Sequence, residues 1–445
     1  MLKRWISQNV EERPRIIKII GNTWWLFFDQ IVRMCVGLLV GVWVARYLGP
    51  ERYGILNYSL ALASLFGAVA TLGLDTFVIQ DIIKTPDRKN DILGTAFYLK
   101  LLAGIATYLF AIISILILKP RAEDQLYRYL IYIISAGVIF QSLDVIDCYF
   151  QSQTKSKYTV WAKTSMLLLI SIARLILIHT NASLVFFAWA SLLELVINGL
   201  ALLYVYQKSE KQLFHWKFDK GIAQGLLIQS WPYYIAYIAA FIYMKIGQIM
   251  IGNMLGDKQA GLFAASARLY ELPFVVIMVF TSSVFPTLVD YYERDRELFY
   301  RRYSQITYVY TILGYLVLAF VWLFGPFLIN LFFGKEYADA FPILSIHMVG
   351  MFIHFNAGLR SSYITLSSNQ KIILITTVIS AVMNVALNYL LIPRYNAAGA
   401  AISTVITQFV ALFLSNIFFA GTKEIFTIQL RSLLLIPSFS RSIRK

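Results

Sequence analysis

The segment LGPERYGIL at residues 48–56 returns as LGDKQAGLF at residues 255–263, a constant offset of 207 positions. Each copy lies between two long apolar runs, and Trp24 and Trp231 keep the same offset. A repeat at this scale in an apolar chain is typical of the duplicated helical bundles from which many secondary transporters are built. We therefore expect a duplicated membrane bundle with its functional groups between the two halves.

The composition also places the chain in a lipid bilayer. Hydrophobic residues make up 59% of the sequence and charged residues 14%, whereas soluble domains carry about 25% charged residues. The mean hydropathy is +0.66, and the apolar runs leave no stretch for a separate soluble domain. The two cysteines, Cys35 and Cys148, fall inside apolar runs and show neither a metal-ligand spacing nor a disulfide framework.

Twelve segments are predicted to cross the membrane, because each approaches the roughly 20 apolar residues that a transmembrane helix needs. The predicted fold class is therefore an all-α polytopic membrane protein, with six spans in each half. The spans are 19–45, 54–79, 92–118, 127–149, 159–179, 183–206, 222–252, 261–289, 303–332, 340–366, 371–392 and 397–420.

Basic residues orient these spans. The net charge of +15 does not indicate a nucleic-acid partner, because lysines and arginines are spread over many short loops. Loops on the N-terminal side carry about three times as many of them as the opposite loops, which places both termini in the cytoplasm. Six spans per half then make the repeats parallel, related by an axis along the membrane normal. The predicted parts are a cytoplasmic segment 1–18, an N-lobe 19–206, a cytoplasmic connector 207–221, a C-lobe 222–420, and a tail 421–445 that either lies on the inner membrane surface or has no role.

Charged side chains inside the apolar runs are the strongest functional signal. At mid-span each costs about 2.5–3.5 kcal/mol, so eight facing lipid would cost on the order of 20–28 kcal/mol. They must therefore face a protein interior or a water-filled cavity. The eight deepest are Asp29, Arg33, Lys100, Arg174, Glu194, Lys245, Arg268 and Glu271, and four others lie nearer the predicted cytoplasmic ends: Asp75, Asp144, Asp147 and Arg360.

Helical spacing sorts these charges. Asp29 and Arg33 share one helix face, as do Arg268 and Glu271 in the other half, so each pair either neutralises itself between helices or serves a site. Three further bases have no opposite charge on their own helix and need a partner from another helix or from the substrate. These are Lys100, Arg174 and Lys245. Bases exceed acids among the deep charges, which favours an anionic substrate group such as a phosphate.

Histidine and asparagine pairs extend the polar set. His347 and His354 lie seven residues apart on one face of the tenth span, where they form either a proton relay or an interior hydrogen-bonded pair. Asn384 and Asn388 either line the same cavity or bond between helices. The sequence contains no Walker A loop, dinucleotide glycine pattern, zinc spacing or nucleophile elbow. We therefore predict neither an enzyme nor a bound cofactor or metal.

Several short motifs resemble a known family, the bacterial polysaccharide flippases that carry O-antigen-type lipid-linked oligosaccharides. Their order and spacing extend over about residues 19–420. They are residues 45–54 (ARYLGPERYG), 248–252 (QIMIG), 261–269 (GLFAASARL) with Pro286, and Asn384 and Asn388 followed by 391–393 (LIP) and 399–401 (GAA). The resemblance implies two six-helix lobes that face each other in a V, as in the multidrug/oligosaccharidyl-lipid/polysaccharide (MOP) superfamily. Many members carry an acid just before the QIMIG stretch, where this chain has Gly247. If that acid contributes to ion coupling in those members, this chain must couple differently.

The resemblance implies a flippase that moves an isoprenoid-diphosphate-linked oligosaccharide across the bacterial inner membrane by alternating access. A polar cavity would shield the glycan, and polysaccharide polymerase and chain-length machinery are implied partners. The candidate diphosphate-binding cations are Arg33, Lys100, Arg174, Lys245 and Arg268, and the candidates for proton or sodium coupling are Asp29, Glu194, Glu271, His347 and His354.

Two other functions remain open at this stage. An ion-coupled multidrug or metabolite antiporter of the same superfamily predicts an acidic cavity. A membrane glycosyltransferase or polymerase needs acids on a sizeable external loop, and the external loops of this chain are short.

Overall fold

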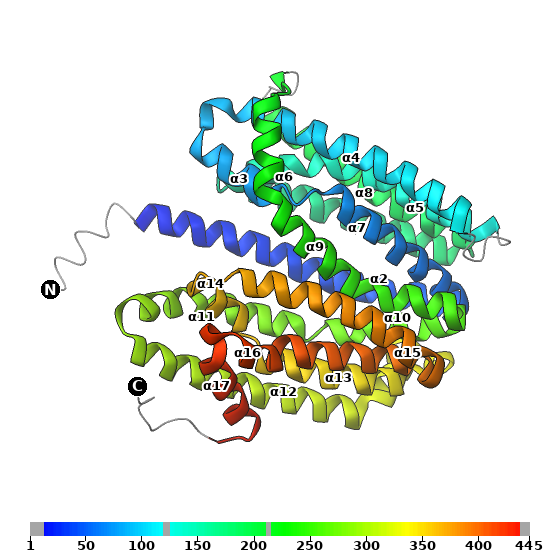
Figure 1. Cartoon of the computed structure of the whole chain (residues 1–445). Coiled ribbons are helices and arrows are strands. Elements are labelled where there is room, and N and C mark those ends of the chain that lie inside the picture. The colour runs from blue at the N-terminus through cyan, green and yellow to red at the C-terminus, as the bar shows by residue number, and fades with distance from the viewer. Residues whose placement is uncertain (1–12, 119–124, 211–214, 437–445) are drawn as a thin grey trace. The chain divides into compact units, whose positions relative to one another are not determined.

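The computed structural model describes residues 13–118, 125–210 and 215–436, which form helices joined by short turns, with no strand among them (Figure 1). Parts of the predicted N-terminal segment, connector and tail lie outside the described residues, namely 1–12, 211–214 and 437–445. The chain divides into two compact units. Unit 1 comprises Met1–Val44 and Leu62–Tyr234, and unit 2 comprises Ala45–Ala61 and Ile235–Lys445.

Ten helices within the described ranges are long and apolar enough to cross a membrane. Two of them contain a break, α2 (Arg13–Ala70) at Gly49 with φ 70°, and α15 (Lys371–Phe409) at Asn396 with φ 54°. Gly49 adopts this backbone readily because it has no Cβ atom, and Pro50 after it has no N–H for a helical hydrogen bond. Dividing both helices at these breaks gives the twelve expected spans, and the all-α polytopic fold class is confirmed.

Unit 1 is a bundle in which α7 packs along α8, and α4 packs along the middle of the fourth span (Figure 1). A hydrophobic core lies where α3 meets α6, with Val78, Ile82, Phe150 and Tyr206 all buried. The elements of unit 1 are part of α2, then α3 (Asp75–Lys84), η1 (Pro86–Arg88), α4 (Lys89–Leu118), α5 (Gln125–Ala136), η2 (Gly137–Asp144), α6 (Val145–Ser152), α7 (Lys157–His179), α8 (Leu184–Glu210) and the start of α9 (Lys220–Leu255).

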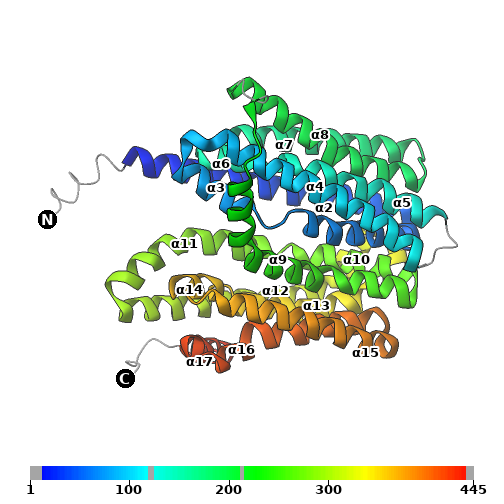
Figure 2. The ribbon, with the colours of Figure 1, turned by 45° about the horizontal axis from the view of Figure 1, so that its top comes forward.

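Unit 2 is a second bundle, in which α13 lies between α12 and α15 (Figure 2). Buried aromatic side chains of α12, including Phe299 and Tyr303, form its core at one end. Its elements are the remaining parts of α2 and α9, then α10 (Asp257–Glu271), α11 (Phe274–Arg294), α12 (Arg296–Phe332), η4 (Lys335–Tyr337), α13 (Ala340–Asn356), α14 (Arg360–Leu366), α15, the π-helix η5 (Val410–Leu414), α16 (Ser415–Phe418), η6 (Ala420–Thr422) and α17 (Lys423–Leu433).

The two copies of the repeated segment cross each other inside unit 2, at Gly54 and Gly261. A Cβ atom on Gly54 would overlap the carbonyl oxygen of Asp257, and one on Gly261 would overlap that of Pro50. Only glycine permits such a close approach of two backbones. The glycines of the repeat thus permit this helix crossing.

The fourth span is not a continuous α-helix. Between α5 and α6 the chain forms η2, a 3₁₀-helix of 8 residues, although such helices rarely exceed three or four residues. Apolar contacts hold it on two sides, because Ile139 packs on Gly104 of α4 and Leu143 packs on Gly199 of α8. This irregular segment ends at Asp144, inside the span.

The described end of the connector, just before α9, caps that helix. The Asp219 carboxylate accepts a hydrogen bond from the backbone N–H of Ile222 at 2.9 Å, which caps α9, and an ion pair from Arg88 at 2.8 Å. The backbone hydrogen bond from Ile222, supported by the Arg88 guanidinium, holds the pKa of Asp219 below its usual range.

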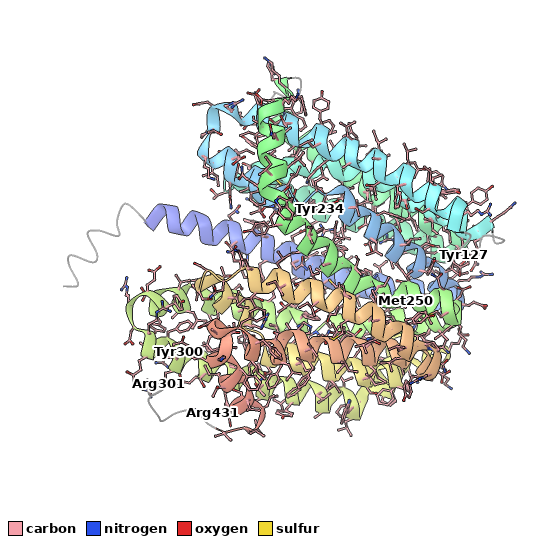
Figure 3. All side chains as sticks on the ribbon, in the orientation of Figure 1. Tyr127, Tyr234, Met250, Tyr300, Arg301 and Arg431 are labelled. Atoms are coloured by element: carbon pink, nitrogen blue, oxygen red, sulfur yellow. The ribbon has the colours of Figure 1, made fainter. Side chains whose placement is uncertain are left out.

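The first part of the tail forms α17 and packs into unit 2. Ile425 and Ile428 are buried, and the Gln429 side chain accepts a hydrogen bond from Asn416 at 2.7 Å. Arg431 of α17 lies at the same end of unit 2 as Arg301 of α12 (Figure 3). The tail is thus part of the bundle, and its contact with the inner membrane surface stays a prediction.

Candidate functional site

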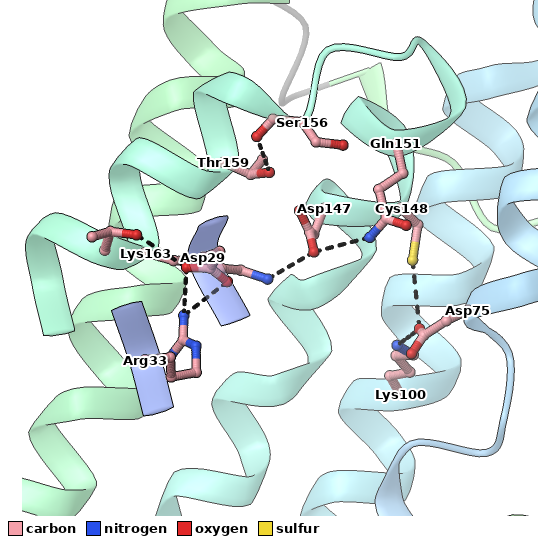
Figure 4. A network of polar contacts seen from close by, with 11 residues as sticks. Asp29, Arg33, Asp75, Lys100, Asp147, Cys148, Gln151, Ser156, Thr159 and Lys163 are labelled. Carbon is pink, nitrogen blue, oxygen red and sulfur yellow. Dashed lines mark hydrogen bonds and ion pairs between the residues drawn. The ribbon is translucent and has the colours of Figure 1, made fainter. Parts of the chain in front are cut away.

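Charged side chains inside the spans of unit 1 gather into a belt carried by five helices and the end of η2. Figure 4 shows the ion pairs of this belt. On α2, Arg33 Nη2 donates to the Asp29 carboxylate one turn earlier, at 3.3 and 3.4 Å. Thr164 of α7 donates its hydroxyl to the same carboxylate at 3.0 Å. The members of this charged belt are Asp29, Arg33, Asp75, Lys100, Asp144, Asp147 and Lys163.

A second pair in the belt joins α6 to α7. Lys163 Nζ lies 2.7 Å from Asp147 Oδ2, and Gln151 Nε2 donates to the same oxygen at 3.1 Å (Figure 4). Both charged side chains are largely buried. Lys163 was not among the sequence candidates, because it lies only one turn into its predicted span and its partner is on another helix.

The third pair joins α4 to α3. Lys100 is buried and forms an ion pair with Asp75, whose side chain is 53% exposed. The Cys148 thiol of α6 donates to the same carboxylate at 3.5 Å. The partner that the sequence could not supply for Lys100 is therefore a protein carboxylate.

Arg174 also finds a partner on a neighbouring helix. Its Nη2 lies 2.8 Å from Glu194 Oε2 of α8 and 3.4 Å from Ser191 Oγ. Each charged side chain of this pair is 21% exposed. This pair links α7 to α8 in unit 1, and it neutralises both candidates.

Unit 2 contains the remaining candidate cations. Lys245 lies half-buried in α9 and forms no hydrogen bond or ion pair with any described residue. Arg268 is half-buried near the end of α10, and Glu271 is the exposed last residue of that helix. The pairing of Arg268 with Glu271, three residues apart on α10, stays a prediction. Lys245 is thus the candidate cation whose charge no described carboxylate balances.

The histidines of α13 have different surroundings. His347 is buried and shares a 2.8 Å hydrogen bond between its Nδ1 and Ser266 Oγ of α10. Its ring also packs on the ring of Phe263, with centroids 5.0 Å apart. His354 is half-buried against the ring of Phe274, at 4.7 Å. The structure therefore holds His347 as an interior hydrogen-bonded residue.

Two buried asparagines follow on α15. Asn388 Nδ2 donates to Asn384 Oδ1 at 2.9 Å, so the pair bonds along one helix rather than between helices. Asn384 Nδ2 and Asn388 Oδ1 have no partner among the described residues. Gly247 of α9 lies beside them, because a Cβ atom there would be 3.9 Å from Asn388 Nδ2.

The sequence pattern of the polysaccharide biosynthesis protein family matches residues 19–292. The chain belongs to this family. The match contains all eight deep charges, and it ends before the two histidines.

Curated relatives span most of the chain. A Shigella dysenteriae protein described as an O-antigen transporter is 23% identical over 82% of this chain and 90% of its own length. The capsular polysaccharide biosynthesis protein CapF of Staphylococcus aureus is 19% identical over 88% of this chain and 97% of its own length. The family resemblance read from the sequence motifs is confirmed.

Solved structures share the fold. A structure of the lipid II flippase MurJ in an inward closed conformation gives a TM-score of 0.71 at 18% identity, covering 94% of this chain and 91% of that one. An inward-facing multidrug resistance MATE family transporter of the MOP superfamily gives a TM-score of 0.69 at 17% identity, covering 92% and 96%. The chain therefore has the MOP-type fold, and it is a multi-pass membrane protein.

Proposed function

We propose that the protein is a flippase that moves an isoprenoid-diphosphate-linked oligosaccharide from the cytoplasmic to the outer leaflet of the bacterial inner membrane, for surface polysaccharide synthesis. The observation that carries this proposal is the family match over residues 19–292. The relatives described as an O-antigen transporter and as CapF act in the same class of pathway by name. Both termini would be cytoplasmic, and a polysaccharide polymerase with its chain-length machinery would use the product.

A glycan needs such a carrier, because its hydroxyl groups would lose their hydrogen bonds in hydrocarbon. Alternating access would expose a polar cavity to each side in turn while the isoprenoid tail stays in lipid.

The diphosphate needs a cation whose charge is not already neutralised. In unit 1, Arg33, Lys100 and Arg174 each pair with a carboxylate. Lys245 in unit 2 forms no such pair with the described residues. We therefore assign the main contact with the diphosphate to Lys245, with Arg268 as a second candidate.

Glycan display in a deletion host tests this assignment. Lys245→Ala should reach the membrane at the normal level but lower surface glycan about tenfold, which equals a loss of about 1.4 kcal/mol of binding. Lys245→Arg should restore part of it, because a guanidinium also binds phosphate. The exposed Lys258→Ala is the matched control. Normal glycan display in both Lys245→Ala and Arg268→Ala would contradict the cationic site.

The alternative is an ion-coupled drug or metabolite antiporter, favoured by the fold shared with the MATE transporter. It predicts that deletion sensitises the host to drugs and leaves the surface glycan intact. Deletion that abolishes the glycan without changing drug sensitivity excludes it.

A further inference from the structure

The charged belt of unit 1 contains four carboxylates and three cations, so one carboxylate has no cation to pair with. In the charged belt, Arg33 pairs with Asp29, Lys100 with Asp75, and Lys163 with Asp147. Asp144 remains, and it forms neither a hydrogen bond nor an ion pair with any residue that the structure describes.

Asp144 lies where other charges can act on it through space. It is half-buried, and the charged groups that face it are Lys163 of α7, Lys100 of α4, Asp75 of α3 and Asp147 of α6. The neighbouring Cys148 thiol also interacts electrostatically with the Asp144 carboxylate. The α8 side of η2 is apolar, because Leu143 packs there on Gly199.

The charge balance of the belt depends on a proton. With every group ionised, the belt is negative by one unit inside a span, and a net charge in that environment is costly. With one carboxyl protonated, it is neutral. Asp29, Asp75 and Asp147 each accept a hydrogen bond from a cation, which stabilises their ionised form, whereas Asp144 has no such donor.

The backbone at this position is also irregular. Asp144 is the last residue of η2 and precedes the first turn of α6. A 3₁₀ stretch inside a helix often marks a hinge. Converting its 8 residues to α-helix would shorten it by about 4 Å, because the rise per residue falls from about 2.0 to about 1.5 Å.

We infer that Asp144 is a proton-exchange site inside unit 1, whose carboxyl group takes up and releases one proton while the three ion pairs of the belt stay intact. The ligand is a proton, and no other co-reactant is needed. The idea that this proton is the coupling ion of transport rests on the proposed function, whereas the proton-exchange site itself does not.

Infrared difference spectroscopy of the full-length protein in lipid vesicles tests the site without any substrate. Wild type should keep a protonated-carboxyl C=O band above about pH 5.5, where an exposed aspartate is already ionised. Asp144→Asn should lose that band, and Asp219→Asn, outside the spans, should keep it. If Asp144→Asn fails to fold, Asp144→Glu should keep the band at a shifted frequency. A wild type without the band, or a band that no Asp144 variant changes, overturns the inference.

Measurements of glycan display in whole cells distinguish this inference from the proposed function. In whole cells, collapse of the proton gradient should lower wild-type glycan display several-fold, while the residual display of Asp144→Asn should not change further. The Asp144→Asn variant could lose the infrared band while a strain that lacks the gene still displays normal surface glycan. That outcome would retain the proton site and contradict the flippase. A gradient response that persists in Asp144→Asn overturns its role in coupling.

Discussion

The ion pair between Arg174 and Glu194 should act as a structural link between α7 and α8. The two side chains meet at 2.8 Å, and each is 21% exposed. Removing one partner of a buried pair costs about 3–5 kcal/mol, because a charge is left uncompensated. Partial exposure screens that charge. We therefore expect Arg174→Met or Glu194→Met alone to lower the free energy of unfolding by about 2–3 kcal/mol.

The double variant should be milder than either single one. With Met at both positions no charge remains, and we expect a loss below about 1 kcal/mol. For a unit of this size, 1 kcal/mol moves the Tm by about 2–4 °C. Each single variant should therefore lower the Tm by about 4–12 °C, and the double variant by less than about 4 °C.

The assay is thermal unfolding of the full-length protein in detergent, monitored by size-exclusion chromatography after heating. A double variant whose loss equals the sum of the single losses would refute the coupling. The double variant should also retain surface glycan, because we do not assign Arg174 to the substrate. Lost glycan with a normal Tm would show that one of the two residues meets the substrate directly.

Three shorter predictions concern packing and caps. Gly261→Ala should destabilise unit 2 by about 1–3 kcal/mol through backbone overlap, measured as a lower Tm, whereas Gly37→Ala, which has open space around it, should not. Tyr337→Phe should cost about 1 kcal/mol in the same assay, because the buried Tyr337 hydroxyl donates to the carbonyl of Ala45 at 2.8 Å; an unchanged Tm would contradict this. The lowered pKa of Asp219 means that its stabilisation of α9 is present above the unfolded pKa and lost as the pH falls through the folded one. Hydrogen exchange at the start of α9 should therefore speed up below about pH 4, and Asp219→Asn should remove that pH dependence.

The fold could be predicted from the sequence because spans depend on local properties. Hydropathy located every span, and the repeat located the break at Gly49. That break follows from residue chemistry, with a left-handed Gly49 and a Pro50 that lacks an N–H. The irregular η2 segment could not be found, because its residues are as apolar as those of a regular helix.

The charged site was only partly predictable. Helical spacing identifies neighbours on one helix, and it found Asp29 with Arg33. It also offered Arg268 with Glu271 as a pair, which stays a prediction. The partners of Lys100 and Arg174 come from other helices, and the rotation of one helix against another is set by packing that the sequence alone does not reveal.

The glycine crossing has a consequence for the origin of the chain. The contact of Gly54 with the Asp257 carbonyl and that of Gly261 with the Pro50 carbonyl are exchanged when the two copies of the repeat are exchanged. Such a self-complementary contact is isologous, the type found in two-fold symmetric homodimers. A single copy of this segment would therefore be able to pair with a second identical copy through the same glycines, and fusion of two such copies would keep that contact within one chain.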